Sequence, residues 1–296
     1  MHCVNQHFVP QYYLKNFSDE GNVYVFDKKI NKFLNNGNSL PVSKIGFEKN
    51  IYDAKPEILQ AFCNPKIESE KFLDTLIEQY NERISAPLIN SFVTLGEEVY
   101  LNNELNLISF IATEDLIDFT IVQFVRTQRF KAFTEDFAKI IFEKLKTQKS
   151  TIQKFSLQEL SNAVHNLFVI SAIDNTQIWK RLNETRILKS EYIIIDEFVN
   201  NITSQLRKMS KTLWVSGIDK FYKTSDTPIL VAASENQKIE NISFPITKRI
   251  CFTFSNYPEF DNEIIKVTEK NVELIDKANE KIIQCAERFT YSYDKN

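Results

Sequence analysis

Glycine is scarce in this chain, with only five among 296 residues. Nucleotide-binding loops of the Rossmann and P-loop types need closely spaced glycines, in the patterns G-x-G-x-x-G or G-x-x-x-x-G-K-[ST]. Neither pattern occurs, because the glycines lie far apart, at Gly21, Gly37, Gly46, Gly96 and Gly217. We therefore do not expect a nucleotide site of the Rossmann or the P-loop type.

Cysteine is also sparse and forms no C-x-x-C pair, since the four residues are Cys3, Cys63, Cys251 and Cys285. None of the three histidines lies at metal-ligand spacing from a cysteine. We therefore expect reduced thiols in a cytoplasmic protein, with no metal site and no cofactor.

Membrane-targeting segments and a strong net charge are missing as well. Residues 1–6 carry neither a charged leader nor an apolar run of signal length, and no window reaches ~18 uninterrupted apolar residues. We expect no membrane partner. The net charge of -3 and the pI of 5.8 oppose a general electrostatic attraction to nucleic acid, although local basic patches are compatible with both values.

Apolar residues are abundant: 43% of the chain is hydrophobic, and 24 residues are Phe. This is enough for a substantial core, and it favours a helix-rich protein. We predict an α+β fold in a single compact unit, residues 1–296. Its sub-regions are an N-terminal helix and hairpin (1–66), a helical region (67–208), and a sheet with a C-terminal helix (209–296).

The middle of the chain has helical periodicity from about Ile67. Its acidic residues Glu70, Glu78 and Glu82 fit a solvated helix face or a metal cluster, and we favour the solvated face. The run from about 103 to 148 is the most apolar and predicts a central, buried helix or pair of helices. Ser156 and Glu159 have the spacing of a capping box, which predicts the start of another helix.

Short β-type segments follow Lys211 and are separated by turns, which predicts an antiparallel sheet. Asn22–Asp27 and Lys32–Leu34 predict a hairpin near the start of the chain. A lone hairpin is too small to be stable, so we expect it to join or cover the C-terminal sheet.

The stretch from Gln6 to Phe17 combines an amide, an imidazole, a proline and an apolar turn. Pro10 suits the first turn of a helix, so we expect a short helix from about Pro10 to Phe17 that docks on a core. Gln6 and His7 precede it in an extended segment. His7 could carry a proton in catalysis, or the two side chains could tie down their own loop.

Two further sites carry candidate polar residues. Gln123 and Arg126 project from one side of the predicted buried helix, where a buried Arg needs either a protein carboxylate or an anionic ligand. The turn from Thr224 to Pro228 holds Ser225 and Asp226. Asp226 could bond its own backbone or orient the imidazole of His7, and Ser225 lacks the G-x-S-x-G pattern of a serine hydrolase.

Several short motifs occur in the order in which they are found in one protein family. They are Q-H-x-V-P-x-x-Y-L-x-x-F from Gln6, the segments 21–27, 46–52, 123–127, 224–228 and 244–247, and the closing segment 279–291. The chain thereby resembles, over nearly its whole length, the mostly bacterial domain-of-unknown-function family DUF4238. That family usually has Pro after Arg-Thr, where this chain has Gln128. The resemblance implies landmarks and no activity.

Our first functional hypothesis is a pocket in which these landmarks meet. His7 would be the general acid/base, Asp226 its partner, and Arg126 the stabiliser of an anionic substrate, with Gln6, Gln123 and Ser225 as substrate-binding residues. With no metal set, the reaction would be metal-independent phosphodiester cleavage by a nuclease or RNase-like effector. Similar uncharacterised proteins suggest a setting in bacterial conflict or phage defence.

The alternative is a non-catalytic regulatory module that binds a nucleotide, a nucleic acid or a protein. Its polar residues would hold a ligand or only the fold. Geometry separates the two hypotheses, because a catalytic set has to converge in an open cleft. The sequence leaves the oligomeric state open.

Overall fold

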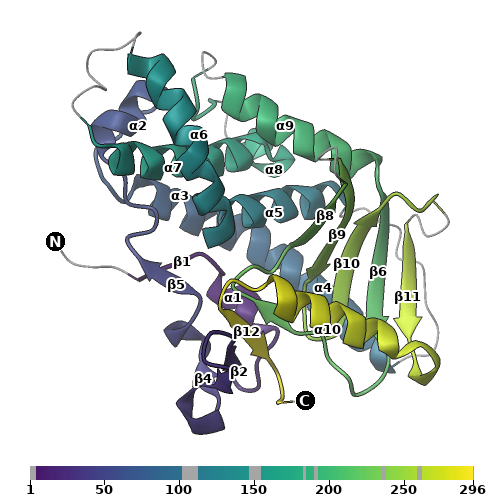
Figure 1. Cartoon of the computed structure of the whole chain (residues 1–296). Coiled ribbons are helices and arrows are strands. Elements are labelled where there is room, and N and C mark those ends of the chain that lie inside the picture. Colours follow the sequence, from purple (N-terminus) through teal and green to yellow (C-terminus); the bar gives the residue numbers. More distant parts are fainter. Residues whose placement is uncertain are drawn as a thin grey trace. The chain divides into compact units, whose positions relative to one another are not determined.

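The computed structural model describes residues 5–101, 113–146, 155–182, 185–189, 193–234, 238–258 and 262–295 (Figure 1). The chain divides into two compact units. Unit 1 comprises Met1–Phe8, Glu48–Ser85 and Glu114–Ser204; unit 2 comprises Val9–Phe47, Ala86–Thr113 and Gln205–Asn296. The predicted α+β class is confirmed, while a single folding unit stays a prediction.

Unit 1 is mainly helical. Its helices are α2 (Pro56–Phe62), α3 (Phe72–Tyr80), the π-helical turn η3 (Asn81–Ser85), α5 (Thr113–Val125), α6 (Gln128–Lys146), α7 (Leu157–Asn175), α8 (Gln177–Leu182) and most of α9 (Ile193–Lys208). A two-stranded sheet pairs β1 (Asn5–His7) with β5 (Phe47–Lys49).

Two helices form the interior of unit 1. Helix α5 is buried on most sides, as its sequence predicts. Helix α7 is buried to the same degree and packs against α2, α3, α6 and α8. Aromatic rings join it to its neighbours, since the ring centroid of Phe168 lies 5.3 Å from those of both Phe130 and Phe198. The long helical middle of the chain therefore has two buried helices where the sequence indicated one region.

Unit 2 contains a five-stranded sheet in the order β11-β6-β10-β9-β8. Its strands are β6 (Ser210–Ser216), β8 (Leu230–Ala233), β9 (Ile239–Pro245), β10 (Ile250–Ser255) and β11 (Glu263–Val267). Neighbours pair in the antiparallel sense except β11, which runs parallel to β6. The sequence did not indicate this parallel pair.

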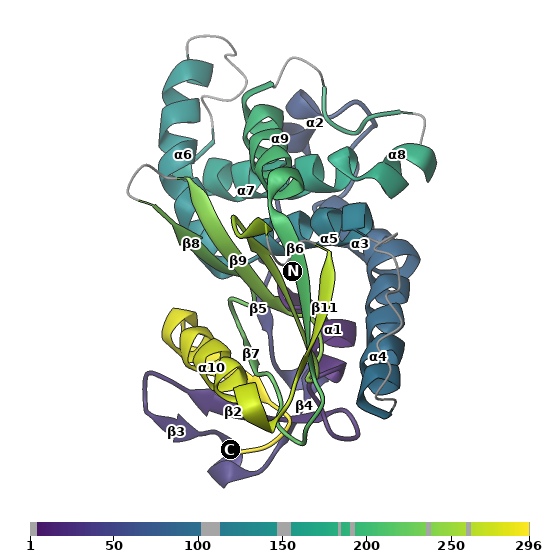
Figure 2. The same cartoon turned by 90° about the vertical axis from the view of Figure 1, so that its right-hand side faces the viewer.

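Two helices cover opposite faces of this sheet, α4 (Ala86–Leu101) and α10 (Glu273–Cys285) (Figure 2). Cys251 of β10 packs in a cluster with Ile275 of α10. The next residue back, Ile250, lies against α4 at Gly96, where an added Cβ would be 3.2 Å from its Cδ1. Successive strand residues point to opposite faces, so β10 is buried between the two helices.

A second sheet of unit 2 joins the two ends of the chain. Its order is β3-β2-β12-β7, with β4 on β2, and the strands are β2 (Asn22–Asp27), β3 (Lys32–Phe33), β4 (Leu40–Pro41), β7 (Thr224–Ser225) and β12 (Phe289–Ser292). Val25 lies opposite Tyr291. The N-terminal hairpin therefore joins C-terminal strands, as expected.

Short helical elements complete unit 2. Helix α1 begins directly after Pro10, which adopts an extended conformation as its N-cap. The predicted opening helix is thus present, shortened at both ends. The short helices are α1 (Gln11–Lys15), η1 (Asn35–Gly37), η2 (Val42–Lys44) and η5 (Glu269–Asn271).

Candidate functional site

The side chain of Gln6 is buried in unit 1, with 1% exposure, and both ends of its amide are bonded. Its Nε2 donates to Asp53 Oδ1 at 2.7 Å, and its Oε1 accepts from the backbone N–H of Tyr52 at 2.7 Å. A buried amide with both ends satisfied contributes to stability and has little left to offer a ligand. Gln6 therefore fixes the Tyr52–Asp53 segment.

Arg126 lies one residue past the end of α5 and is 2% exposed. Its Nε donates to Tyr52 Oη at 3.2 Å, its Nη1 to Asn81 Oδ1 at 3.3 Å and its Nη2 to the carbonyl of His7 at 2.8 Å. All three acceptors are neutral. The sequence left open a carboxylate or an anionic ligand as partner, and the structure shows two side-chain oxygens and one backbone carbonyl of unit 1 as the acceptors instead.

The pKa of a neighbouring carboxylate, Asp74, is shifted in the same region. Burial raises the pKa of Asp74, and the charges of Glu78 and Asp53 raise it further, while Arg126 opposes the rise. Arg126 thus has a long-range counter-charge without a direct ion pair among the described residues.

Two more residues complete what we call the Tyr52 hub, defined as Gln6, His7, Tyr52, Arg126 and Asn166. Asn166 Nδ2 donates to the Tyr52 carbonyl at 2.8 Å, and the half-buried His7 contributes its carbonyl to Arg126. Beside the hub, Gln123 Nε2 donates to the carbonyl of Phe8 at 2.9 Å. The four sequence-predicted residues of unit 1, Gln6, His7, Gln123 and Arg126, therefore lie in one bonded cluster.

Ser225 and Asp226 belong to unit 2 and have partners there. The Asp226 carboxylate accepts from the backbone N–H groups of Glu287, Arg288 and Phe289 at 2.8–2.9 Å. The pKa of Asp226 is raised, because burial and the charge of Glu287 raise it while the three backbone bonds lower it. Ser225 Oγ accepts from the backbone N–H of Thr227 at 3.1 Å. Both side chains thus hold the backbone around β12 and β7, and a pairing of Asp226 with His7 stays a prediction.

His165 was not singled out by the sequence, yet it lies against the hub. Its ring is fully buried and stacks on Tyr52, with 6.2 Å between centroids. Its Nε2 lies 2.9 Å from the Val125 carbonyl, which can only accept, so Nε2 carries the proton. Burial lowers its pKa to about 3, and the imidazole is therefore neutral.

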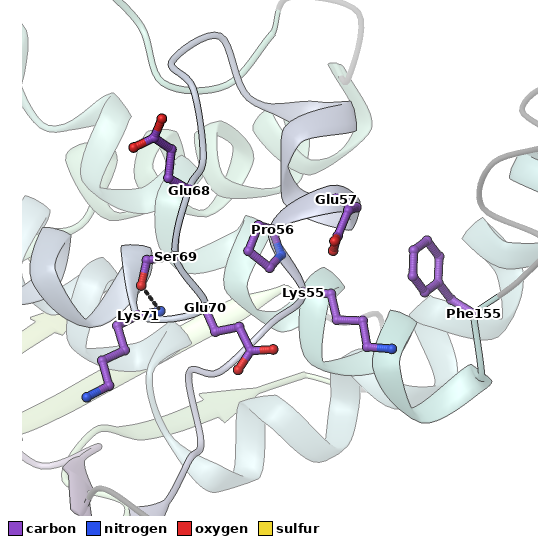
Figure 3. Close-up of a pocket in the computed structure, with 8 residues that line it drawn as sticks. All are labelled: Lys55, Pro56, Glu57, Glu68, Ser69, Glu70, Lys71 and Phe155. Carbon is purple, nitrogen blue, oxygen red and sulfur yellow. Dashed lines mark hydrogen bonds between the residues drawn. The ribbon is translucent and has the colours of Figure 1, made fainter. Parts of the chain in front are cut away.

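A cavity of about 770 Å³ opens in unit 1 (Figure 3). Three segments line it, and they contribute Lys55, Pro56, Glu57, Glu68, Ser69, Glu70, Lys71 and Phe155. Phe155 precedes α7, whose predicted capping box between Ser156 and Glu159 is confirmed. The same Glu159 reaches Lys55 Nζ at 2.5 Å, so the helix cap also fixes one wall of the cavity.

The sequence did not indicate this cavity. Its carboxylates occur in ordinary polar segments, and Glu70 looked like part of a solvated helix face. The one local signal was the capping box, which marks where α7 starts and so where Phe155 lies, but it does not reveal Lys55 as its partner.

Among the residues that the structure describes, no group of three or more His, Cys, Asp or Glu residues could hold a metal ion. None of the described helices combines the length and the apolar character required to cross a bilayer.

A family model described as "Protein of unknown function (DUF4238)" matches residues 5–296. The chain belongs to the DUF4238 family. The resemblance carried by the short motifs is thereby confirmed. No curated protein and no solved structure matches this DUF4238 chain.

Proposed function

We propose that this DUF4238 protein is a non-catalytic binding module whose recognition site is the cavity of unit 1. The observation that carries the proposal is the set of hydrogen bonds that holds Tyr52 and Asp53 in place. Gln6 makes two hydrogen bonds to this pair, and Asn166 and Arg126 make one each. Two residues later the chain enters the cavity wall at Lys55.

A wall that is already rigid favours binding, because the conformational entropy of its residues is lost during folding and not when the ligand binds. Next to Lys55, the capping box of α7 and the ion pair between Lys55 and Glu159 restrict the position of Phe155. Gln6, Arg126 and Asn166 thus hold the Tyr52–Asp53 segment that leads into the cavity wall, and they do not line the cavity themselves.

Phosphodiester cleavage makes a different demand on the same residues. A general acid/base and a charge stabiliser have to contact the reacting atoms. The carboxylate of Asp226 accepts three backbone bonds, and the guanidinium of Arg126 is 2% exposed with three bonds of its own. This engagement favours the module over the nuclease.

The deciding experiment incubates the purified chain with single-stranded RNA, single-stranded DNA and nucleotides in the presence of EDTA. We expect no cleavage above buffer, and we expect His7→Ala and Asp226→Asn to act on the melting temperature alone. Cleavage that disappears in His7→Ala at an unchanged melting temperature would establish the metal-independent nuclease and remove the module. If nucleotides or RNA bind and are not cleaved, the module has a nucleic-acid or nucleotide partner.

A further inference from the structure

Two lysines line the cavity, Lys55 and Lys71, and the charge of Lys55 is already matched by Glu159. The Lys55 Nζ lies 2.5 Å from Glu159, a residue outside the lining. Its ammonium also lies 5.5 Å from the ring centroid of Phe155. The bonded Glu159 raises the pKa of Lys55, and the charges of Glu57 and Glu70 add to the rise. A cation is thus already stabilised at this place in the fold.

Two carboxylates of the cavity interact with Lys55 only at longer range and form no direct bond among the described residues. Among the described residues, neither Glu57 nor Glu70 has a hydrogen-bond or ion-pair partner. Figure 3 shows the carboxylates of Glu57 and Glu70 directed toward Lys55, whose ammonium lies next to Phe155. The other lining carboxylate, Glu68, extends away from Phe155 and is paired with Lys66 at 2.6 Å.

We propose that the cavity binds an organic cation, a guanidinium or an ammonium group, between the carboxylates of Glu57 and Glu70 and the ring of Phe155. Carboxylates form charge-assisted hydrogen bonds with such groups, and an aromatic face attracts them. Three carboxylates and two ammonium groups line the cavity, and this excess of negative charge disfavours a phosphate. This inference rests on the proposed function and names its ligand class.

The size of the cavity suits more than a single small ion. A volume of about 770 Å³ falls in the range of small-molecule sites, which hold ligands of several functional groups. An arginine side chain with its neighbouring peptide groups fits this volume, and so does a linear polyamine. The cation has two natural sources, a basic segment of a protein partner and a free polyamine.

The test titrates the full chain with three probes in low-salt buffer and follows binding by NMR. The probes are the peptide acetyl-Gly-Arg-Gly-amide, the same peptide with citrulline in place of Arg, and spermidine. Citrulline keeps the shape of arginine and removes its charge. We expect the Arg peptide or spermidine to bind at least about tenfold more tightly than the citrulline peptide. The tighter of the two cations identifies the source.

Variants locate the site. Glu57→Gln and Glu70→Gln should each weaken the binding of the cation by about fivefold to tenfold, whereas the matched control Glu68→Gln should change it less than about twofold. Phe155→Leu keeps an apolar wall and removes the aromatic face, and it should also weaken binding.

Equal affinity for the Arg and citrulline peptides overturns the inference, and so does equal weakening by all three Glu→Gln variants. Neither result touches the proposed function, which falls only if the chain cleaves phosphodiesters. A neutral or anionic ligand that is lost in Phe155→Leu would leave the module in place and replace the ligand class.

Discussion

Acidification from about pH 7.5 to about pH 5 should destabilise the fold through one residue, His165. The imidazole is fully buried and neutral, with its Nε2 proton donated to Val125 and no bond to its Nδ1 among the residues that the structure describes. Protonation would place a second N–H, and a charge, in this site without an acceptor. Folding therefore favours the neutral ring.

The magnitude follows from the pKa difference. The folded pKa of His165 is about 3, against about 6.5 for an ordinary histidine. Its contribution to stability is full above the unfolded pKa and is lost as the pH falls toward the folded pKa, since only the unfolded chain then binds the proton. By linkage, the loss is about 2 kcal/mol at about pH 5 and close to zero at about pH 7.5.

Urea unfolding followed by tryptophan fluorescence at the two pH values measures this loss. His165→Gln keeps an N–H donor for Val125 and cannot take up a proton, so its pH-dependent loss should be smaller than that of the wild type by about 2 kcal/mol. His7→Gln, which removes a half-buried histidine, should retain the loss.

Other titrating groups act in both proteins and cancel in the comparison. The carboxylates of Asp74 and Asp226 have raised pKa values, so they stabilise the fold on acidification, which is opposite to the effect of His165. An equal loss in the wild type and His165→Gln would refute the assignment of a neutral, buried imidazole.

Three further predictions concern stability, and chemical denaturation measures each. Arg126→Met should lower the free energy of unfolding by about 3 kcal/mol, because one buried and two partly buried acceptors lose their donor; a loss under about 1 kcal/mol would contradict this. Asp226→Asn should cost about 2–3 kcal/mol, since an amide NH₂ then faces backbone N–H groups, and an unchanged midpoint would count against it. Gly46→Ala should cost about 1–2 kcal/mol more than Gly21→Ala, because both have positive φ but only at Gly46 would the new Cβ lie 3.0 Å from a neighbouring side chain; equal costs would oppose this reading.

Local patterns were good predictors of elements. The capping box at Ser156 and the turn after Pro10 depend on residues a few positions apart, and both formed as expected. Helix α7 escaped recognition as a buried helix because Ser161, His165 and Asn166 interrupt its apolar pattern. At least two of these polar side chains are bonded across the interior, so polarity at those positions signalled partners and not solvent.

Strand order was harder to predict than strand existence. The parallel pairing of β11 with β6 joins strands about fifty residues apart, and hydrophobic alternation is the same in a strand of either direction. The two sheets of unit 2 are likewise indistinguishable by period. Long-range pairing, which no local window contains, decided both features.

The candidate residues were recognisable by type, while their roles were set by distant partners. Gln6 bonds a backbone group 46 residues away, and Asp226 bonds Glu287, 61 residues away. A sequence shows an amide or a carboxylate but not the N–H that it accepts from. The amide of Gln6 and the carboxylate of Asp226, which the sequence offered as candidate site groups, therefore form hydrogen bonds within the fold.

The motifs behind the family resemblance contact one another. Gln6 bonds Tyr52, Arg126 bonds the carbonyl of His7, and Gln123 bonds that of Phe8, so the motifs that begin at residues 6, 46 and 123 form one scaffold. The cavity residues Glu57 and Glu70 lie outside every such motif. Membership of DUF4238 thus reports the scaffold and leaves the ligand undetermined. It follows that exchanging the cavity carboxylates should alter what the protein binds while the scaffold, and with it the melting temperature, stays intact.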